Sequence, residues 1–85
     1  MRLVALIPAI LALATPAVAH DRCHVPHDQR RPANELRADL AAKGWTVRKI
    51  EMEDGCYEVH GQDRSGLSVE VLFDPASFQE RGRDD

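Results

Sequence analysis

Apolar and polar residues alternate along much of the segment from Trp45 to Phe73, with the period of β-strands that bury one face. Asp54-Gly55 interrupts the alternation with the residue types that a two-residue hairpin turn prefers, because both of its central positions need positive φ. Residues Asp63-Arg-Ser-Gly66 predict a second turn, led by the aspartate and with the glycine in the left-handed position. The pattern therefore predicts three antiparallel strands joined by two tight turns.

The two turns fix the register of the three strands independently. The first turn places Glu51 opposite Glu58, and the second places His60 opposite Glu70. In both registers the apolar residues fall on one face of the sheet: Ile50, Met52, Tyr57, Val59, Val69, Val71 and Phe73. The other face receives Cys56, Glu58 and His60. Trp45 and Val47 have the wrong parity for the apolar face, which predicts a bulge near Arg48-Lys49 that returns them to it.

A short amphipathic helix is predicted from Ala33 to Lys43, where strong helix formers surround Leu36 and Leu40 at i, i+4 spacing. Pro32 suits the first turn of a helix, and Gly44 suits the position just after the last turn. The fold class predicted is α+β, with this one helix packed on the apolar face of a three-stranded antiparallel sheet. Ser77-Phe78-Gln79 is a candidate for a short fourth strand, and residues 80–85 are expected to fray.

The first nineteen residues have the features of a secretory signal peptide. Arg2 is followed by the apolar run Leu3–Ala14 and by Ala17-Val18-Ala19, a small-x-small cleavage site. We therefore expect residues 1–19 to be removed, residues 20–31 to form an extended arm, and residues 32–79 to form one domain. The apolar run is short for a membrane anchor, so no membrane span is expected after cleavage and the location is periplasmic or secreted.

Charge and cysteine content narrow the range of partners and stabilising links. The formal net charge of −3 argues against nucleic acid and anionic membranes as partners. A domain this small buries little apolar surface and benefits from a covalent link. Cys23 and Cys56, the two cysteines of the chain, are expected to form that link in an oxidising compartment. Free thiols or a metal pair are the alternatives, although the spacing matches no zinc pattern.

The ordered set Gly44-Trp45-Thr-Val, Ile50-Glu-Met-Glu-Asp-Gly-Cys-Tyr-Glu-Val59, Asp63-Arg-Ser-Gly66, Val69-Glu-Val71 and Asp74-Pro75 resembles the PepSY domain. It is most similar to small exported PepSY-like proteins with one such module behind a signal peptide. The resemblance implies a helix on an antiparallel sheet and a role in inhibiting or regulating proteases, or in binding ligands, without enzymatic activity or a cofactor. The chain departs from the family after Asp74-Pro75, where Ala-Ser-Phe-Gln replaces the frequent x-Thr-Gly-Glu.

Two groups of residues are candidates for binding. Glu51, Glu58, His60 and Glu70 are predicted to lie on an open, acidic sheet face that could dock a protein or peptide of the cell envelope, with a peptidase as one such partner. In the arm, His20, His24 and His27 could bind a metal ion, with His20 also contributing the α-amino group after cleavage. A disulfide would hold the arm roughly 13 Å from His60, at about 3.3 Å per strand residue, so His60 is not expected to join them.

No catalytic residues are predicted, because the sequence offers no nucleophile with an oriented base. The leading hypothesis is thus an exported, non-enzymatic binding or regulatory module. The alternative is a periplasmic metal-binding protein that uses the histidine-rich arm.

Overall fold

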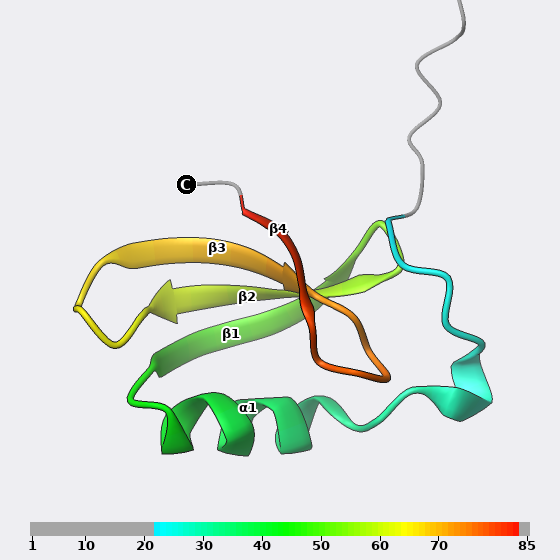
Figure 1. The fold of residues 1–85 in the computed structure, drawn as a ribbon, viewed down its shortest axis with the longest axis horizontal. Coiled ribbons are helices and arrows are strands. Elements are labelled where there is room, and N and C mark those ends of the chain that lie inside the picture. The colour runs from blue at the N-terminus through cyan, green and yellow to red at the C-terminus, as the bar shows by residue number, and fades with distance from the viewer. Residues whose placement is uncertain (1–21, 84–85) are drawn as a thin grey trace, which may run out of the picture.

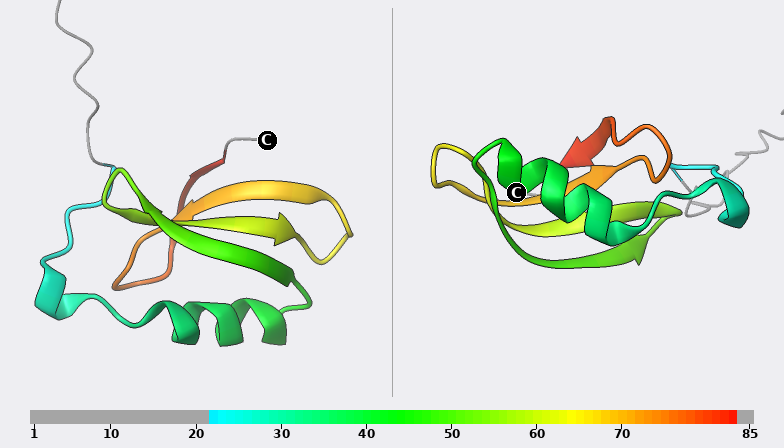
Figure 2. Two further views of the ribbon diagram at one scale, coloured as in Figure 1. Left: turned by 180° about the vertical axis from the view of Figure 1, so that it is seen from behind. Right: turned by 90° about the horizontal axis from the view of Figure 1, so that it is seen from below.

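The computed structural model describes residues 22–83 as an α+β fold in which one helix packs against an open four-stranded antiparallel sheet (Figure 1). The strands lie in the sheet in their chain order, and α1 covers one face (Figure 2). The elements are a 3₁₀ turn η1 (His27–Gln29), α1 (Ala33–Ala42), β1 (Thr46–Glu53), β2 (Cys56–Gln62), β3 (Ser68–Phe73) and β4 (Glu80–Arg83). The predicted signal peptide and His20 lie outside the described residues.

Helix α1 begins at Ala33, as predicted, and ends at Ala42, one residue before the predicted end. Pro32 is the N-cap residue, and Lys43 is the C-cap residue, with Gly44 following at a φ of 90°. Leu36 and Leu40 are fully buried at 0% and 2% exposure, so the i, i+4 pair forms the apolar stripe that packs on the sheet. In the described part of the chain, no helix has the length and apolar character needed to cross a bilayer.

Both predicted turns and both predicted registers are confirmed. Asp54 and Gly55 have φ values of 51° and 76°, as a type I′ turn requires, and the pairing places Glu51 opposite Glu58. At the second turn the Gly66 N–H donates to the Asp63 carbonyl, and His60 pairs with Glu70. The turn residues therefore determine which side chains share a face across β1, β2 and β3.

The predicted bulge lies between Val47 and Lys49, where the register of β1 shifts against β2. A Cβ atom on Gly61 would collide with the Thr46 carbonyl oxygen, so this close approach of backbones requires glycine. The bulge returns Trp45 to the helix-covered face, where its ring meets that of Phe73 edge to face at 5.9 Å.

The main core lies between α1 and the sheet. Its buried members are Leu36, Leu40, Val59, Val69, Val71 and Phe73, and Trp45, Val47, Ile50, Tyr57 and Phe78 pack against them. Met52 departs from the prediction, because its side chain has the expected parity but remains 44% exposed. The reason is its position on β1, which is an edge strand of the four-stranded sheet and has a paired neighbour on one side only among the described residues.

The fourth strand lies later in the chain than predicted. Ser77 belongs to a turn that follows β3, whereas Glu80–Arg83 pairs with β3 as β4 in the stretch that was expected to fray. Asp74 organises this turn by accepting hydrogen bonds from the N–H groups of Ala76 and Ser77 at 2.8 and 2.9 Å. The sequence of β4, Glu-Arg-Gly-Arg, has no apolar alternation, which is why the hydrophobic pattern misses it.

Candidate functional site

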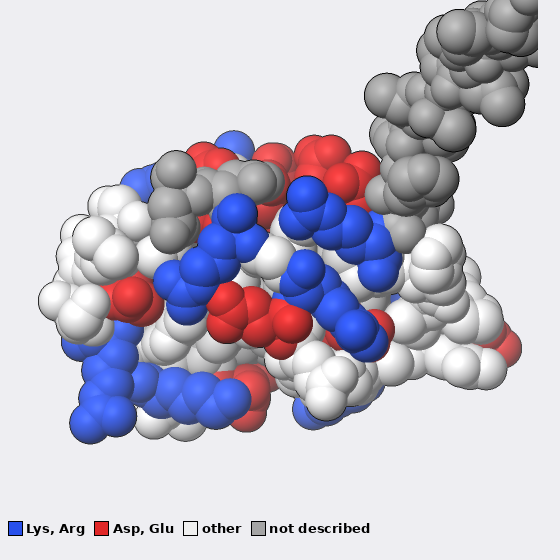
Figure 3. Space-filling view, turned by 45° about the horizontal axis from the view of Figure 1, so that its top comes forward, with Lys and Arg blue, Asp and Glu red and all other residues white. Residues whose placement is uncertain are grey.

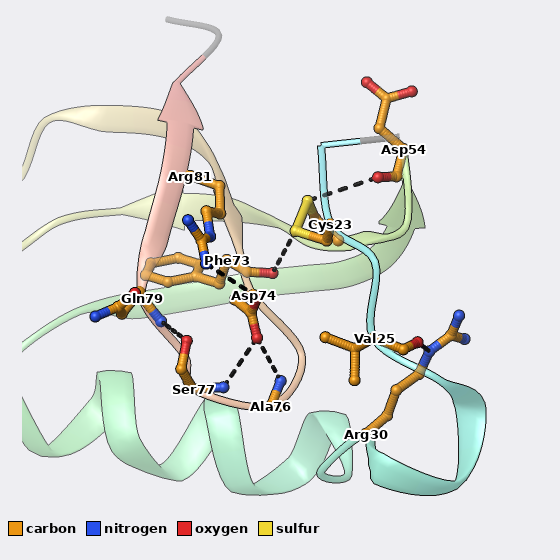
Figure 4. Close-up of a disulfide and its surroundings, with 11 residues drawn as sticks. Cys23, Val25, Arg30, Asp54, Phe73, Asp74, Ala76, Ser77, Gln79 and Arg81 are labelled. Atoms are coloured by element: carbon orange, nitrogen blue, oxygen red, sulfur yellow. Dashed lines mark hydrogen bonds and ion pairs between the residues drawn. A yellow bond between two sulfur atoms is a disulfide. The ribbon is translucent and has the colours of Figure 1, made fainter. Parts of the chain in front are cut away.

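The predicted disulfide between Cys23 and Cys56 is present and ties the N-terminal arm to the start of β2 (Figure 4). Both cysteines are buried with Leu72 in a second apolar cluster, which lies on the sheet face opposite α1. The Cys23 N–H also donates to the Asp54 carbonyl at 3.2 Å. The Cys23 Sγ lies 3.9 Å from the Phe73 carbonyl oxygen, a van der Waals contact because a disulfide sulfur carries no hydrogen. This cluster therefore covers part of the sheet face opposite α1.

The rest of the arm is also held against the domain. The Tyr57 hydroxyl donates to the Arg31 carbonyl at 2.6 Å, and the Arg31 N–H donates to the Pro75 carbonyl at 2.9 Å. The Arg31 guanidinium lies 3.8 Å from the centre of the Phe78 ring, which is a cation–π contact. The arm thus runs along the domain from the disulfide to α1 and is held to it by these contacts.

The arm histidines do not meet other potential metal ligands in the described residues. His24 and His27 are both exposed, with His27 in the turn η1. Among residues 22–83, the group of side chains whose ligand atoms converge is Glu51, Glu58 and His60, all within 4.8 Å of one another. The structure therefore brings together three of the four residues predicted for the sheet face.

His60 is the centre of this group. Its Nε2 lies 2.8 Å from Glu58 Oε1 and 3.4 Å from Glu51 Oε1, while its Nδ1 lies 3.3 Å from Glu70 Oε1. We refer to Glu51, Glu58, His60 and Glu70 as the Glu/His cluster. The hairpin register produces it, because three neighbouring strands contribute one or two members each on the same face.

The Glu/His cluster is less open than predicted. Glu58 and His60 are 7% and 8% exposed, whereas the side chains of Glu51 and Glu70 are close to half exposed. The difference follows from the strand order: β2 lies inside the sheet, and the long side chains on β1 and β3 flank it from both sides. Glu51 and Glu70 can therefore contact a large partner directly, whereas Glu58 and His60 lie beneath them.

The surface charge is also more mixed than an acidic face would be. Figure 3 shows Lys and Arg side chains interspersed with Asp and Glu side chains over that side of the molecule. Beside the cluster, Lys49 Nζ lies 3.6 Å from Glu51 Oε2. Elsewhere, Arg81 pairs with Asp74 at 3.3 Å. Opposite charges so interspersed cancel at longer range, so any electrostatic recognition acts at short distance.

Asp74 stabilises the turn before β4 in its ionised form. The N–H of Ser77, with that of Ala76 and the Arg81 guanidinium, holds the pKa of Asp74 below its ordinary value, although burial acts in the opposite direction. Figure 4 shows the carboxylate directed into the turn, with Ser77 and Ala76 below it and Arg81 above it. Asp74 thus has a structural role that links β3 to β4.

A shallow hollow of about 470 Å³ lies at the end of the sheet opposite the disulfide. It is lined by Trp45, Asp63, Arg64, Ser65 and Arg83. The Ser65 hydroxyl donates to Asp63, and this bond is the largest influence that lowers the pKa of Asp63. Sequence reasoning missed the hollow because Arg83 reaches it only through β4. The sequence did contain one indication of the hollow, because Trp45 and the Asp63 turn fall at the same end of the predicted sheet.

The chemistry of the Glu/His cluster favours cation binding over nucleophilic catalysis. Every polar partner of His60 among the described residues is a carboxylate, and none is a hydroxyl or a thiol. A serine, threonine or cysteine nucleophile needs its hydroxyl or thiol within hydrogen-bond reach of the base. The cysteines cannot supply a thiol, because both are in the disulfide.

A comparison with protein families gives one result that covers most of the chain. A family model described as "Peptidase propeptide and YPEB domain", of the PepSY type, matches residues 3–80. No curated protein and no solved structure matches the chain. Modules of this propeptide type are generally non-catalytic, and the family together with the disulfide fits an exported protein. With a match that spans the helix and the first three strands, the chain belongs to the PepSY family.

Proposed function

We propose that the protein is an exported, non-enzymatic binding module, periplasmic or secreted, that captures an extended segment of a cell-envelope protein and thereby restrains it. A peptidase is the partner class that the family description supports.

The observation that carries the proposal is the free edge of β1. In the described part of the chain β1 pairs with β2 alone. A two-residue turn makes its flanking residues, Glu53 and Cys56, a hydrogen-bonded pair, and such pairs alternate along an antiparallel ladder. The backbone N–H and C=O groups of Met52 and Ile50 therefore point outward, away from β2. An extended peptide can add to these groups as a fifth strand.

The side chains of β1 suit the same mode of binding. Met52 is exposed on the helix-covered side of the sheet, and an added strand would cover it and gain apolar contact. On the opposite side, Glu51 is half exposed and able to meet a basic side chain. At the far end of β1 the Val47 carbonyl accepts a hydrogen bond from Arg37, so docking is expected from Lys49 to Glu53.

Photocrosslinking tests the proposal. A photoreactive amino acid is placed at Met52 on the β1 edge and, as a matched control, at Leu67, which is 57% exposed beyond the second turn. The disulfide-bonded protein is irradiated in extract of the cell envelope, and crosslinked proteins are identified by mass spectrometry. We expect one protein to be enriched from position 52 relative to position 67 and, once purified, to lose activity on binding. Equal capture from both positions would contradict docking at the edge.

A further inference from the structure

A second binding function rests on the Glu/His cluster, which lies on the sheet face opposite α1 and shares Glu51 with β1. We propose that Glu51, Glu58 and His60 bind a divalent transition metal ion such as Zn²⁺, and that Glu70 orients the imidazole ring of His60. The site would use side chains of the rigid sheet rather than the histidines of the arm.

The ligand atoms lie close enough together to share one such ion. Two atoms about 2.1 Å from one tetrahedral ion lie about 3.4 Å apart. His60 Nε2 and Glu51 Oε1 are separated by 3.4 Å, and Glu58 Oε1 lies 2.8 Å from the same nitrogen. Glu58 Oε1 would move away from Nε2 on binding, and all three atoms already lie within 4.8 Å of one another. Two carboxylates and one imidazole are a ligand set that Zn²⁺ accepts, with solvent in the remaining position.

The opposite nitrogen of His60 provides a second, separate indication. Histidine ligands of metal ions commonly donate their other ring N–H to a carboxylate, which fixes the tautomer and the orientation of the ring. Glu70 Oε1 lies 3.3 Å from His60 Nδ1 and comes from β3, whereas the two carboxylate ligands come from β1 and β2. The ring is thus held by one carboxylate at Nδ1 while Nε2 faces the two others.

The charge balance of the cluster points in the same direction. Three carboxylates surround one imidazole, and Glu51 lies directly opposite Glu58 on the neighbouring strand, where like charges destabilise a sheet. Lys49 pairs with Oε2 of Glu51, which leaves Oε1 facing His60. Glu58 has no polar partner outside the cluster among the described residues, although its side chain is only 10% exposed. A divalent cation would offset the negative charge of these carboxylates.

The test uses the protein with its disulfide formed and without an affinity tag, because tag histidines bind metal. Calorimetry with Zn²⁺ should show one ion bound per chain. The Co²⁺-bound protein should have a visible absorption spectrum typical of nitrogen and oxygen ligands. Glu58→Gln and Glu51→Gln should each weaken Zn²⁺ binding by about tenfold or more, and His60→Gln should abolish it. Glu70→Gln should weaken binding by about tenfold, the effect typical of a residue that orients a ligand.

Two controls make the result decisive. Glu53→Gln changes a carboxylate on the same strand that lies outside the cluster, and it should leave the affinity unchanged. The double variant His24→Ala/His27→Ala should also bind normally. No Zn²⁺ binding by the unmodified protein, or binding that survives His60→Gln and is lost in the arm variant, would overturn the proposal. Because Glu51 is half exposed, Glu51→Gln tests the site even where Glu58→Gln impairs folding.

Discussion

Breaking the Cys23–Cys56 disulfide should remove a large part of the stability of this protein. The two cysteines are 33 residues apart, and closing a loop of that length stabilises the folded state by about 3.7 kcal/mol in the chain-entropy description. A domain of this size is stable by roughly 3–9 kcal/mol in total, at about 0.05–0.15 kcal/mol per residue. The reduced protein is therefore expected to be marginally folded.

Urea denaturation followed by circular dichroism measures this loss. With a slope of about 1 kcal/mol per molar urea for so small a domain, the midpoint should fall by about 3–4 M on reduction. The double variant Cys23→Ala/Cys56→Ala should agree with the reduced protein, which separates the cross-link from the side chains themselves. A loss of less than about 1 kcal/mol in both would refute the reasoning. It would mean that the hydrogen bonds of the arm to Asp54 and Pro75 hold it in place without the covalent link.

Two further predictions concern the sheet and the turn before β4. Gly61→Ala should destabilise the protein by about 2–3 kcal/mol, because the methyl group meets a backbone carbonyl at the bulge. Gly82→Ala is the matched control and should cost less in urea denaturation, since its methyl group meets mainly the movable end of Arg22. For Asp74, whose folded pKa is lowered, ionisation stabilises the fold above about pH 4, and this stability is lost as pH falls through the folded pKa. Asp74→Asn should thus be less stable than the unmodified protein at pH 6, and the gap should close near pH 2.

The glycine prediction and the Asp74 prediction each have an outcome that would contradict them. Similar losses for Gly61→Ala and Gly82→Ala would show that the sheet moves to accommodate the bulge. A stability gap for Asp74→Asn that is the same at pH 6 and pH 2 would assign the role of Asp74 to hydrogen bonding alone, without a contribution from its charge.

Much of the sheet could be predicted because local residue types determine it. Asp54-Gly55 and the turn ending at Gly66 set the two registers. Each register then determines which side chains of the paired strands share a face. The parity of Trp45 then implied a bulge, which the structure contains. The disulfide followed from there being two cysteines in a small chain that was expected to be exported. The inferences about the turns and the bulge depend on neighbours in sequence, where the physical rules are strongest.

The features that were missed depend on contacts between distant segments. Strand β4 has a polar sequence and is held by pairing with β3 and by the Asp74 turn. The burial of His60 could not be read from alternation, which assigns a side chain to a face but does not say what covers that face. The exposure of Met52 likewise depends on which strand forms the edge of the sheet.

The central claim is that the free edge of β1 binds an extended segment of a partner. The most direct test compares Met52→Pro with Met52→Thr in affinity for the protein that is captured by crosslinking. Proline removes the outward N–H and obstructs an added strand, whereas threonine keeps the N–H and favours a strand. We predict that Met52→Pro binds at least about tenfold more weakly while Met52→Thr stays within about twofold of the unmodified protein. Equal affinities for the two variants would show that the partner does not bind by strand addition at β1.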